Sequence, residues 1–375
     1  MNKKLIALAI ATAVSAPAMA ATSNVDVYGL MSVGVDSVTN NNAAAGDSSK
    51  RVGRVSDYAS RIGFKGTEDL GNGLAATWQI EQAVAADGGT GSTFGGGGLR
   101  NTFVGLKSND LGEVRVGRHD TPYKMATGSL DPFADTLGDY NNIVGAYSAT
   151  SVGAAANNAS SYFDQRISNT VVYLTPNFSG FSAAGSYVFG AETATSGSAS
   201  TGNLYSLAAM YAAGPLYLTA AYEKHNFGST GTGSMSGVGN TDAKAWKLGA
   251  SYSIMDFTLA AMYEKTDDNQ GASGANLYGH RTWFLSGKYQ MGAVALKASY
   301  ANAGSDNQFA TGDNGAKAYT VGADYGFSKR TTVYALYTKI SNDTNAAYNF
   351  NYNGASGVGT GDSVSGLSLG LKHSF

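Results

Sequence analysis

The sequence offers few side chains that could make or break covalent bonds. Gly366-Leu-Ser-Leu-Gly370 matches the string of a nucleophile elbow, but its Ser368 lies inside an alternating apolar segment rather than at a strand-to-helix turn. The four histidines are scattered without metal-ligand spacing, and the chain has no cysteine. We therefore predict that the protein is not an enzyme and that it holds no cofactor and no metal.

A second group of side chains suggests electrostatic rather than bond chemistry. Asp131, Asp135 and Asp139 are evenly spaced within residues 121–166, a stretch that is too long for an ordinary loop and has no sustained alternation. The same stretch carries apolar residues that can pack: Leu130, Pro132, Phe133, Leu137, Tyr140, Ile143, Val144 and Tyr147. We expect a loop that lies against a wall with its charges facing water. Its aspartates either form an acidic rim or cap turns inside the loop, since Asp131 precedes a proline and Asp139 follows a glycine.

The wall is predicted from the alternation of apolar with small or polar residues, which has a period of two. In residues 60–66, for example, Ile62 and Phe64 share one face and Arg61 and Lys65 the other. Sixteen such segments recur, most of them near the length that a tilted strand needs to cross a bilayer: 24–35, 60–66, 74–81, 99–107, 113–120, 167–175, 181–189, 204–213, 216–225, 244–254, 257–266, 281–290, 294–302, 317–327, 331–340 and 364–375.

The connections between these segments alternate in length. Short turns rich in Gly, Pro, Asn and Asp, such as 69–73 and 214–215, alternate with long Gly/Ser/Thr/Asn loops, such as 226–241 and 342–362. This pattern is typical of an outer-membrane barrel with an even number of strands. A soluble β-sandwich also alternates, but it exposes sheet edges, whereas sixteen strands close around a polar lumen with none. The 23 tyrosines suit belts at the two lipid–water interfaces.

The N-terminus has the pattern of an export signal. Lys3 and Lys4 precede an apolar run at 5–16 and a small-x-small cleavage site that ends at Ala20. We expect residues 1–20 to be removed and residues 21–375 to form a single barrel domain. The mature chain has 27 acidic residues and a formal net charge of about −4, which argues against a nucleic-acid binder. No mature segment has the apolar run that a membrane-spanning helix needs.

Several stretches along the chain carry a family resemblance: Val25-Asp-Val-Tyr-Gly29, Arg61-Ile-Gly-Phe-Lys-Gly66, Arg100-Asn-Thr-Phe-Val-Gly-Leu-Lys107, Gly112-Glu-Val-Arg-Val-Gly-Arg118, Asp131-Pro-Phe-Ala-Asp135 and Gly366-Leu-Ser-Leu-Gly-Leu-Lys-His-Ser-Phe375. Together they resemble the general diffusion porins of Gram-negative bacteria, particularly the betaproteobacterial branch. The resemblance implies an all-β protein, a 16-stranded antiparallel transmembrane β-barrel that assembles as a homotrimer in the outer membrane. It implies that the third long loop, 121–166, folds inward and narrows the pore. It also implies that the barrel-assembly machinery reads the terminal Phe375.

The resemblance further implies that a basic wall faces the acids of this loop, formed by Arg61, Arg100 and Arg166. Strand parity supports two of these residues independently. Arg61 opposes the apolar face of its segment, and Arg100 shares the parity of Thr102, which we expect to face the lumen. Arg166 lies just outside its segment, so its direction rests mainly on the resemblance. Further lumen candidates by parity are Lys65, Glu81 and Arg115.

Arg118 is predicted to point outward, because it shares the parity of Val114 and Val116. A bare arginine that faces lipid at mid-depth costs about 2–4 kcal/mol. We therefore expect Arg118 at a subunit interface, paired with a carboxylate from a neighbouring copy.

We predict that the protein forms a water-filled channel for passive diffusion of ions and small hydrophilic solutes, tuned by opposed charges at its narrowest point. Its partners are then the lipid bilayer, its own copies, the assembly machinery and the solutes in transit, with no nucleic acid. The alternative is a substrate-specific outer-membrane channel with a solute-binding lumen, which needs a ladder of lumen aromatics or a dedicated basic track. The sign of ion selectivity does not follow from the net charge, which sums loops, exterior and lumen.

Overall fold

The computed structural model describes residues 24–41, 50–88, 98–146, 163–190, 202–226, 242–268, 279–305 and 313–375. The predicted signal peptide, residues 1–20, lies outside the described residues. So does part of the predicted inward loop, 147–162.

The described strands form one antiparallel sheet whose two ends meet. β1 (Asn24–Asn41) pairs with β17 (Ser363–Ser374) over residues 30–41, in a register that places Val35 opposite Leu369. Each other strand pairs with its neighbours in sequence: β4 (Leu74–Ala83), β5 (Thr102–Ser108), β6 (Gly112–Asp120), β7 (Arg166–Leu174), β8 (Phe181–Phe189), β9 (Asn203–Ala213), β10 (Leu216–Asn226), β11 (Asp242–Ile254), β12 (Phe257–Asp268), β13 (Arg281–Met291), β14 (Val294–Ala303), β15 (Ala316–Gly326) and β16 (Thr331–Asn342).

β2 (Lys50–Asp57) and β3 (Arg61–Gly71) act as one interrupted strand, because they pair with successive parts of β1: β2 with residues 33–40 and β3 with residues 24–30. The break lies at residues 58–60, where Ala59 has a φ of 56°. Counted in this way, the sheet is a closed 16-stranded antiparallel barrel, as predicted. The sequence reasoning missed residues 50–57 as a strand. Its alternation is obscured because Val52 and Val55 are both exposed although they have opposite parity.

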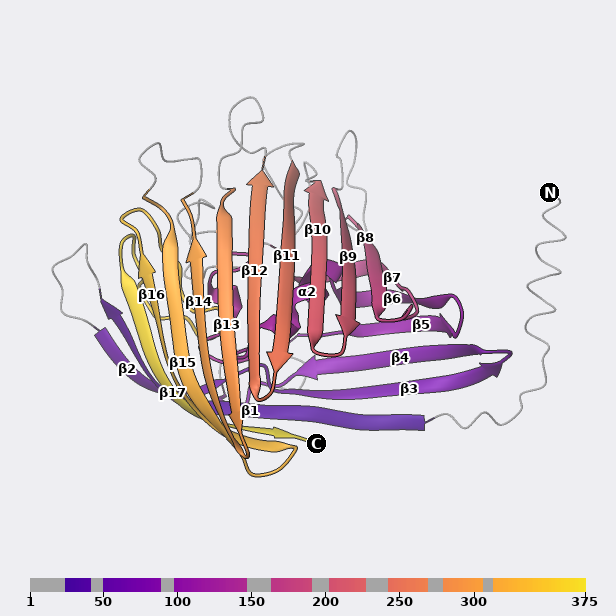
Figure 1. The fold of residues 1–375 in the computed structure, drawn as a ribbon, viewed down its shortest axis with the longest axis horizontal. Coiled ribbons are helices and arrows are strands. Elements are labelled where there is room, and N and C mark those ends of the chain that lie inside the picture. Colours follow the sequence, from indigo (N-terminus) through magenta and orange to yellow (C-terminus); the bar gives the residue numbers. More distant parts are fainter. Residues whose placement is uncertain are drawn as a thin grey trace.

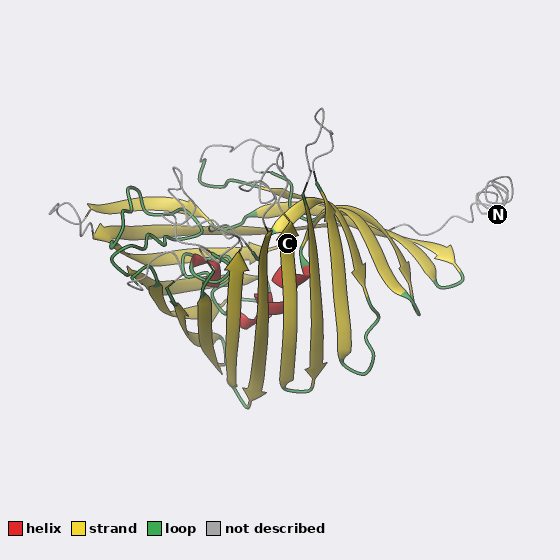
Figure 2. Ribbon diagram, turned by 90° about the horizontal axis from the view of Figure 1, so that it is seen from above, coloured by secondary structure: helices red, strands yellow, loops and turns green. Residues whose placement is uncertain are grey.

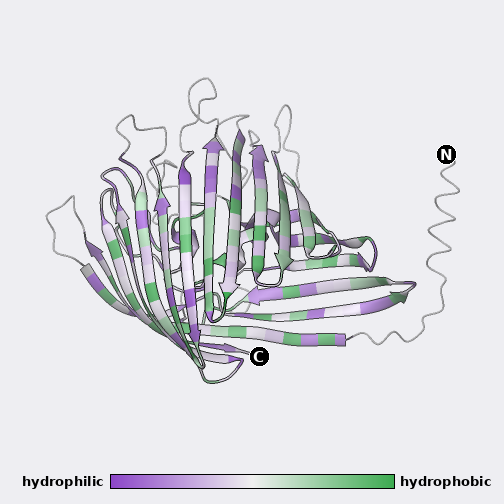
Figure 3. Ribbon diagram, viewed as in Figure 1, coloured by the Kyte–Doolittle hydropathy of each residue, from purple (hydrophilic) through white to green (hydrophobic). Residues whose placement is uncertain are grey.

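Exposure follows the predicted alternation. On β17, Leu367 and Leu369 are each 57% exposed, whereas Ser368 between them is buried. Figure 3 shows the same pattern as short bands of opposite hydropathy along the strands. The apolar faces of the strands are therefore on the outside. Among the described residues, no helix is both long and apolar enough to span a membrane.

The hydrophobic core lies between the inner face of the sheet and the segments that fold onto it. After Thr121, the chain forms α2 (Pro122–Thr127), η1 (Gly128–Leu130) and η2 (Tyr140–Asn142), which lie within the ring of strands in Figures 1 and 2. Apart from Pro132, which is only partly buried, the predicted packing residues from Leu130 to Val144 form one buried cluster with wall residues such as Tyr334 and Leu336. Gly366 on β17 allows this close approach, because an added Cβ would lie 2.4 Å from Leu137 Cδ2.

Candidate functional site

The loop at 121–146 is fixed first at its two ends. At its start, the Thr121 side chain accepts a hydrogen bond from the backbone N–H of Lys124, and Pro122 occupies the first turn of α2. The Tyr123 hydroxyl then donates to Glu264 on β12 at 2.7 Å, with both side chains buried. Glu264 also accepts the backbone N–H of Gly145 at 2.9 Å, so one carboxylate holds both ends of the segment.

A buried ion pair completes this anchor. Lys247 of β11 pairs with Asp164, which follows the undescribed part of the loop, and neither side chain is exposed to solvent. The Tyr140 hydroxyl donates to the other oxygen of Asp164 at 3.1 Å. We call Tyr123, Asp164, Lys247 and Glu264 the root cluster. Its charges have no access to water, so it fixes the loop rather than acting on solutes.

The middle of the loop is held by hydrogen bonds that side chains of the barrel wall donate to its backbone carbonyls. Ser286 of β13 donates to the Leu130 carbonyl at 2.7 Å. Lys297 of β14 and Lys372 of β17 donate to the carbonyls of Pro132 and Ala134, each at 2.9 Å. Because strands from β10 to β17 contact one loop of a closed barrel, these contacts lie on the inner face. We call residues 132–135 the loop tip.

The tip presents one carboxylate to the wall at β3, which is separated from β17 by β1 alone. Asp135 accepts from Arg61 Nη1 at 3.0 Å and from the Tyr352 hydroxyl at 3.0 Å, and both partners in the ion pair remain partly exposed. Burial opposes ionisation of Asp135, but the charges of Arg61, Arg100 and Lys372 outweigh it and lower the pKa of this carboxyl. Asp135 is therefore ionised at neutral pH.

A second ion pair lies on the same wall as Arg61. Arg100 Nε lies 2.6 Å from Glu81 Oε1, and the Tyr28 hydroxyl donates to the other Glu81 oxygen at 2.8 Å. We call the charged section formed by Arg61, Glu81, Arg100 and Asp135 the slit. Its acidic and basic groups lie side by side, a charge pattern suited to orienting ions and water.

Asp131 and Asp139 do not reach the slit. Asp131 accepts the backbone N–H groups of Phe133 and Tyr140, and Asp139 accepts those of Asp135 and Asn141, all at 2.8–3.0 Å. Burial, helped by neighbouring carboxylates, raises the pKa of Asp131 to about 8 and that of Asp139 to about 6. Of the two interpretations left open by the sequence, the turn-cap reading fits both residues, and the acidic rim is reduced to Asp135.

The parity argument for Arg100 was wrong, although its side chain does turn inward. Val104 is 61% exposed and lies on the outer face. Thr102 has the same parity as Val104 and faces outward too, so strict alternation would also have placed Arg100 on the outer face. The pairing of Leu99 with Gln82 is one residue out of step with that of Phe103 with Gln79. This irregularity turns Arg100 towards Glu81, and no alternation pattern reveals it.

The other predicted basic residues form separate groups. Arg166 begins β7 and pairs with Asp120 at 3.0 Å, while its Nε donates to Asn101. Arg115 donates two hydrogen bonds to the Glu113 carboxylate, of 2.8 and 2.9 Å. Together with Lys65, Phe103 and Lys107, this pair lines a cavity of about 380 Å³ towards the short-turn end of the strands. Lys65, Arg115 and Arg166 therefore make no contact with Asp135.

Of the two residues predicted to act in assembly, Arg118 lies on the outside of the barrel and Phe375 lies at the seam where the chain's last strand meets β1. Arg118 donates to the Leu99 carbonyl at 2.7 Å and to the Ser168 hydroxyl at 3.0 Å, and no carboxylate of the described residues lies within ion-pair distance. Phe375 closes the ladder with Gly29 through two backbone hydrogen bonds, and its ring is 44% exposed.

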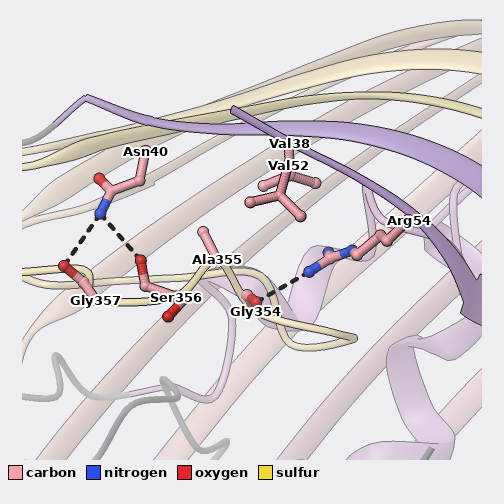
Figure 4. Close-up of a pocket in the computed structure, with 8 residues that line it drawn as sticks. All are labelled: Val38, Asn40, Val52, Arg54, Gly354, Ala355, Ser356 and Gly357. Atoms are coloured by element: carbon pink, nitrogen blue, oxygen red, sulfur yellow. Dashed lines mark hydrogen bonds between the residues drawn. The ribbon is translucent and has the colours of Figure 1, made fainter. Parts of the chain in front are cut away.

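Sequence reasoning missed the contribution of a second inward segment, 343–362. Its residue Tyr352 reaches the slit, and its backbone is tied to the barrel wall beside a cavity of about 290 Å³. There Asn40 donates to the carbonyls of Ser356 and Gly357, and Arg54 donates to that of Gly354 (Figure 4). No periodic pattern marks this segment. Lys297 and Lys372, by contrast, were recoverable, because each has the parity opposite to the exposed leucines of its strand.

The fold and the charged slit define a membrane channel, and comparison with known proteins agrees. The model of the Gram-negative porin family matches residues 7–345, so the chain belongs to this family. It is 31% identical to outer membrane porin protein 32 of Delftia acidovorans over the full length of both chains. It is 29% identical to the major outer membrane protein P.IB of Neisseria lactamica, again over both full lengths.

A solved structure gives the same picture. The anion-selective porin from Comamonas acidovorans superimposes with a TM-score of 0.73 at 27% identity, covering 94% of this chain and all of that one. The chain is thus an outer-membrane porin that forms a diffusion channel and not an enzyme, as predicted.

Proposed function

We propose that the mature chain, residues 21–375, conducts small hydrophilic solutes passively and favours anions, with Arg61, Arg100 and Asp135 at its narrowest section. The arginines of the slit are each paired with a carboxylate. Four lysines with inner-face parity have no carboxylate within ion-pair distance in the described part of the chain: Lys65, Lys107, Lys288 and Lys372. Asp26, which lies opposite Lys65 in the sheet register, is an acid of the same face, but these lysines outnumber it, and this excess of positive charge on the lumen wall carries the proposal.

The physical consequence is a lumen with positive potential. Unpaired cations along a water-filled passage raise the local concentration of anions, and the effect weakens as salt screens the charges. The solved relative whose name describes it as anion-selective supports the same sign. The paired charges of the slit add a transverse field that orients permeant ions without changing the net charge.

Bilayer recording tests this function. We expect the purified protein to conduct in a planar bilayer and its reversal potential in a KCl gradient to have the sign of chloride preference, declining at higher salt. A potential with the sign of potassium preference contradicts the anion proposal. A conductance that saturates with one solute class favours a substrate-specific channel instead.

We also propose that three copies assemble through one sector of the outer wall. The exposed large apolar residues of β8–β16 include many aromatics, such as Tyr187, Trp246, Tyr252, Trp283 and Tyr325, whereas those of β1–β6 are all aliphatic. Aromatic belts belong at lipid–water interfaces, so the sector with fewer exposed aromatics is the one suited to protein contact. Arg118 lies in this sector, where a neighbouring carboxylate supplies its missing counter-charge.

Two measurements test assembly. Native mass analysis of the detergent-purified protein is expected to give a trimer, and Arg118→Glu is expected to weaken it more than Arg281→Glu on β13. A wild-type monomer contradicts the trimer. We further propose that Phe375 is recognised during barrel assembly, since its exposed ring ends the closing strand. Its deletion is then expected to lower the amount of folded protein in the outer membrane, and an unchanged amount argues against this role.

A further inference from the structure

Two lysines on the C-terminal strands hold the loop tip in place. Lys297 Nζ donates to the Pro132 carbonyl and Lys372 Nζ to the Ala134 carbonyl, so their contacts lie on either side of Phe133 and directly before Asp135. Both come from the inner face of the wall, one from β14 and one from β17. Each cation lies 2.9 Å from a peptide oxygen, which makes both hydrogen bonds charge-assisted.

The surroundings of the two lysines favour this arrangement over a free rotamer. Lys297 is also paired with Asp324 at 2.8 Å and lies over the Phe133 ring at 4.7 Å, so its ammonium is fixed from three directions. Lys372 lies 5.6 Å from the centroid of the Tyr334 ring. The tip itself is irregular, since Asp135 has a φ of 53°, a left-handed conformation that aspartate adopts more readily than most residues but at some cost in free energy.

We propose that Lys297 and Lys372 are positioning residues that set the width of the channel by clamping the loop tip against the inner wall. The clamp fixes where the Asp135 carboxylate lies relative to Arg61, and it acts through backbone carbonyls rather than through contact with the solute. Loss of one charge-assisted hydrogen bond increases the population of a displaced tip by roughly tenfold or more. The inference rests on the proposed role of the slit as the narrowest section.

A neighbouring lysine provides a matched control. Lys288 of β13 is directly opposite Lys297 in the sheet register, and its side chain is exposed. No hydrogen bond from it to the tip exists among the described residues. Replacing Lys288 therefore removes the same charge from the same wall while the clamp stays intact.

The experiment compares Lys297→Met/Lys372→Met with Lys288→Met, each single variant and Lys372→Arg. Charge loss alone shifts the reversal potential away from anions and leaves the entry of neutral sugars unchanged. Because the tip is docked on the inner wall, its release moves it into the lumen, so we expect the double variant to show larger current fluctuations and slower entry of large neutral sugars in liposome swelling. Lys372→Arg, which keeps a cationic donor, is expected to stay near the wild type.

Neutral sugars make the result decisive, because they do not respond to the charge of the wall. If the double variant and both single methionine variants of the clamp match Lys288→Met in current fluctuations and sugar entry, the clamp is refuted. The singles protect the test against misfolding, since Lys372→Met leaves the Lys297–Asp324 pair intact. A wild type that does not conduct refutes the channel proposal itself, whereas a conducting wild type with unaltered clamp variants refutes only the clamp.

Discussion

The central loop carries ion pairs at its root and at its tip, and they differ in their access to water. Lys247 and Asp164 at the root both have side chains that are 0% exposed, whereas Arg61 and Asp135 at the tip are 23% and 26% exposed. A buried pair is costly to break because each partner left alone is an uncompensated charge. A half-exposed pair stays in contact with the lumen, where its field acts on solutes. The same chemistry thus anchors the loop at one end and tunes the passage at the other.

The largest effect is expected from breaking the root. Lys247→Met leaves Asp164 and Glu264 buried without their cation, which costs about 3–5 kcal/mol of folding free energy. Lys244→Met is the matched control on the same strand, since its pair with Asp267 is 3.8 Å long and the lysine is 44% exposed. That variant is expected to change stability by less than about 1 kcal/mol. Urea unfolding in detergent measures both, and equal losses would contradict the assignment of the root.

The next effect concerns the tip. Arg61→Gln/Arg100→Gln leaves Asp135 and Glu81 as unpaired acids in the slit, so the anion preference is expected to fall strongly. Arg281→Gln removes an exposed arginine of β13 that has outward parity and serves as the control. Reversal potentials in a salt gradient give the comparison. Unchanged selectivity in the double variant removes these arginines from the constriction.

A pair of tyrosines sharpens the contrast. Tyr123 donates to Glu264 at the root at 2.7 Å, and Tyr352 donates to Asp135 at the tip at 3.0 Å. Tyr123→Phe leaves a buried carboxylate without a donor and is expected to cost roughly 1.5–3 kcal/mol. Tyr352→Phe leaves Asp135 with Arg61 and with water, so its cost is expected to stay below about 1 kcal/mol. Thermal unfolding of the two variants tests the order, and the reverse order would count against it.

The smallest effect is a dependence on pH within the loop. The pKa of Asp131 is raised to about 8, so its protonated form favours the docked loop. This contribution is complete below the ordinary value of about 4 and is lost as the pH rises through about 8. We expect current fluctuations from loop motion to increase between about pH 4 and 8 and Asp131→Asn to flatten this increase. A variant with the same pH profile as the wild type shows that the increase comes from other groups.

The barrel was predictable because the alternation of apolar with small or polar residues is repeated from strand to strand. Alternation in β17 identified the lipid-facing leucines, and the same parity, read on the other face, would have identified Lys372. The apolar residues of the loop also predicted its docking, since Phe133 and Leu137 have no other way to avoid water. Local periodicity therefore carries the architecture and much of the lumen wall.

The slit was less predictable because it depends on departures from that rule. Arg100 turns inward through a one-residue irregularity, and β2 carries valines on both faces. The roles of the three aspartates follow from which backbone N–H groups the loop leaves free, a property of its folded path. Tyr352 comes from a segment more than two hundred residues away in sequence from Asp135 and has no pattern of its own. Contacts of this kind are set by tertiary packing.

The seam between Gly29 and Phe375 has a kinetic consequence. β1 pairs with β17, which lies more than three hundred residues later in the chain, so the ring cannot close until β17 has been made and exported. Until then two unpaired strand edges persist, and they are templates for aggregation. Pairing of strands so distant in sequence also has a large loop-closure entropy, which slows ring closure. A porin of this design therefore depends on protection of its open intermediate for as long as the last strand is missing.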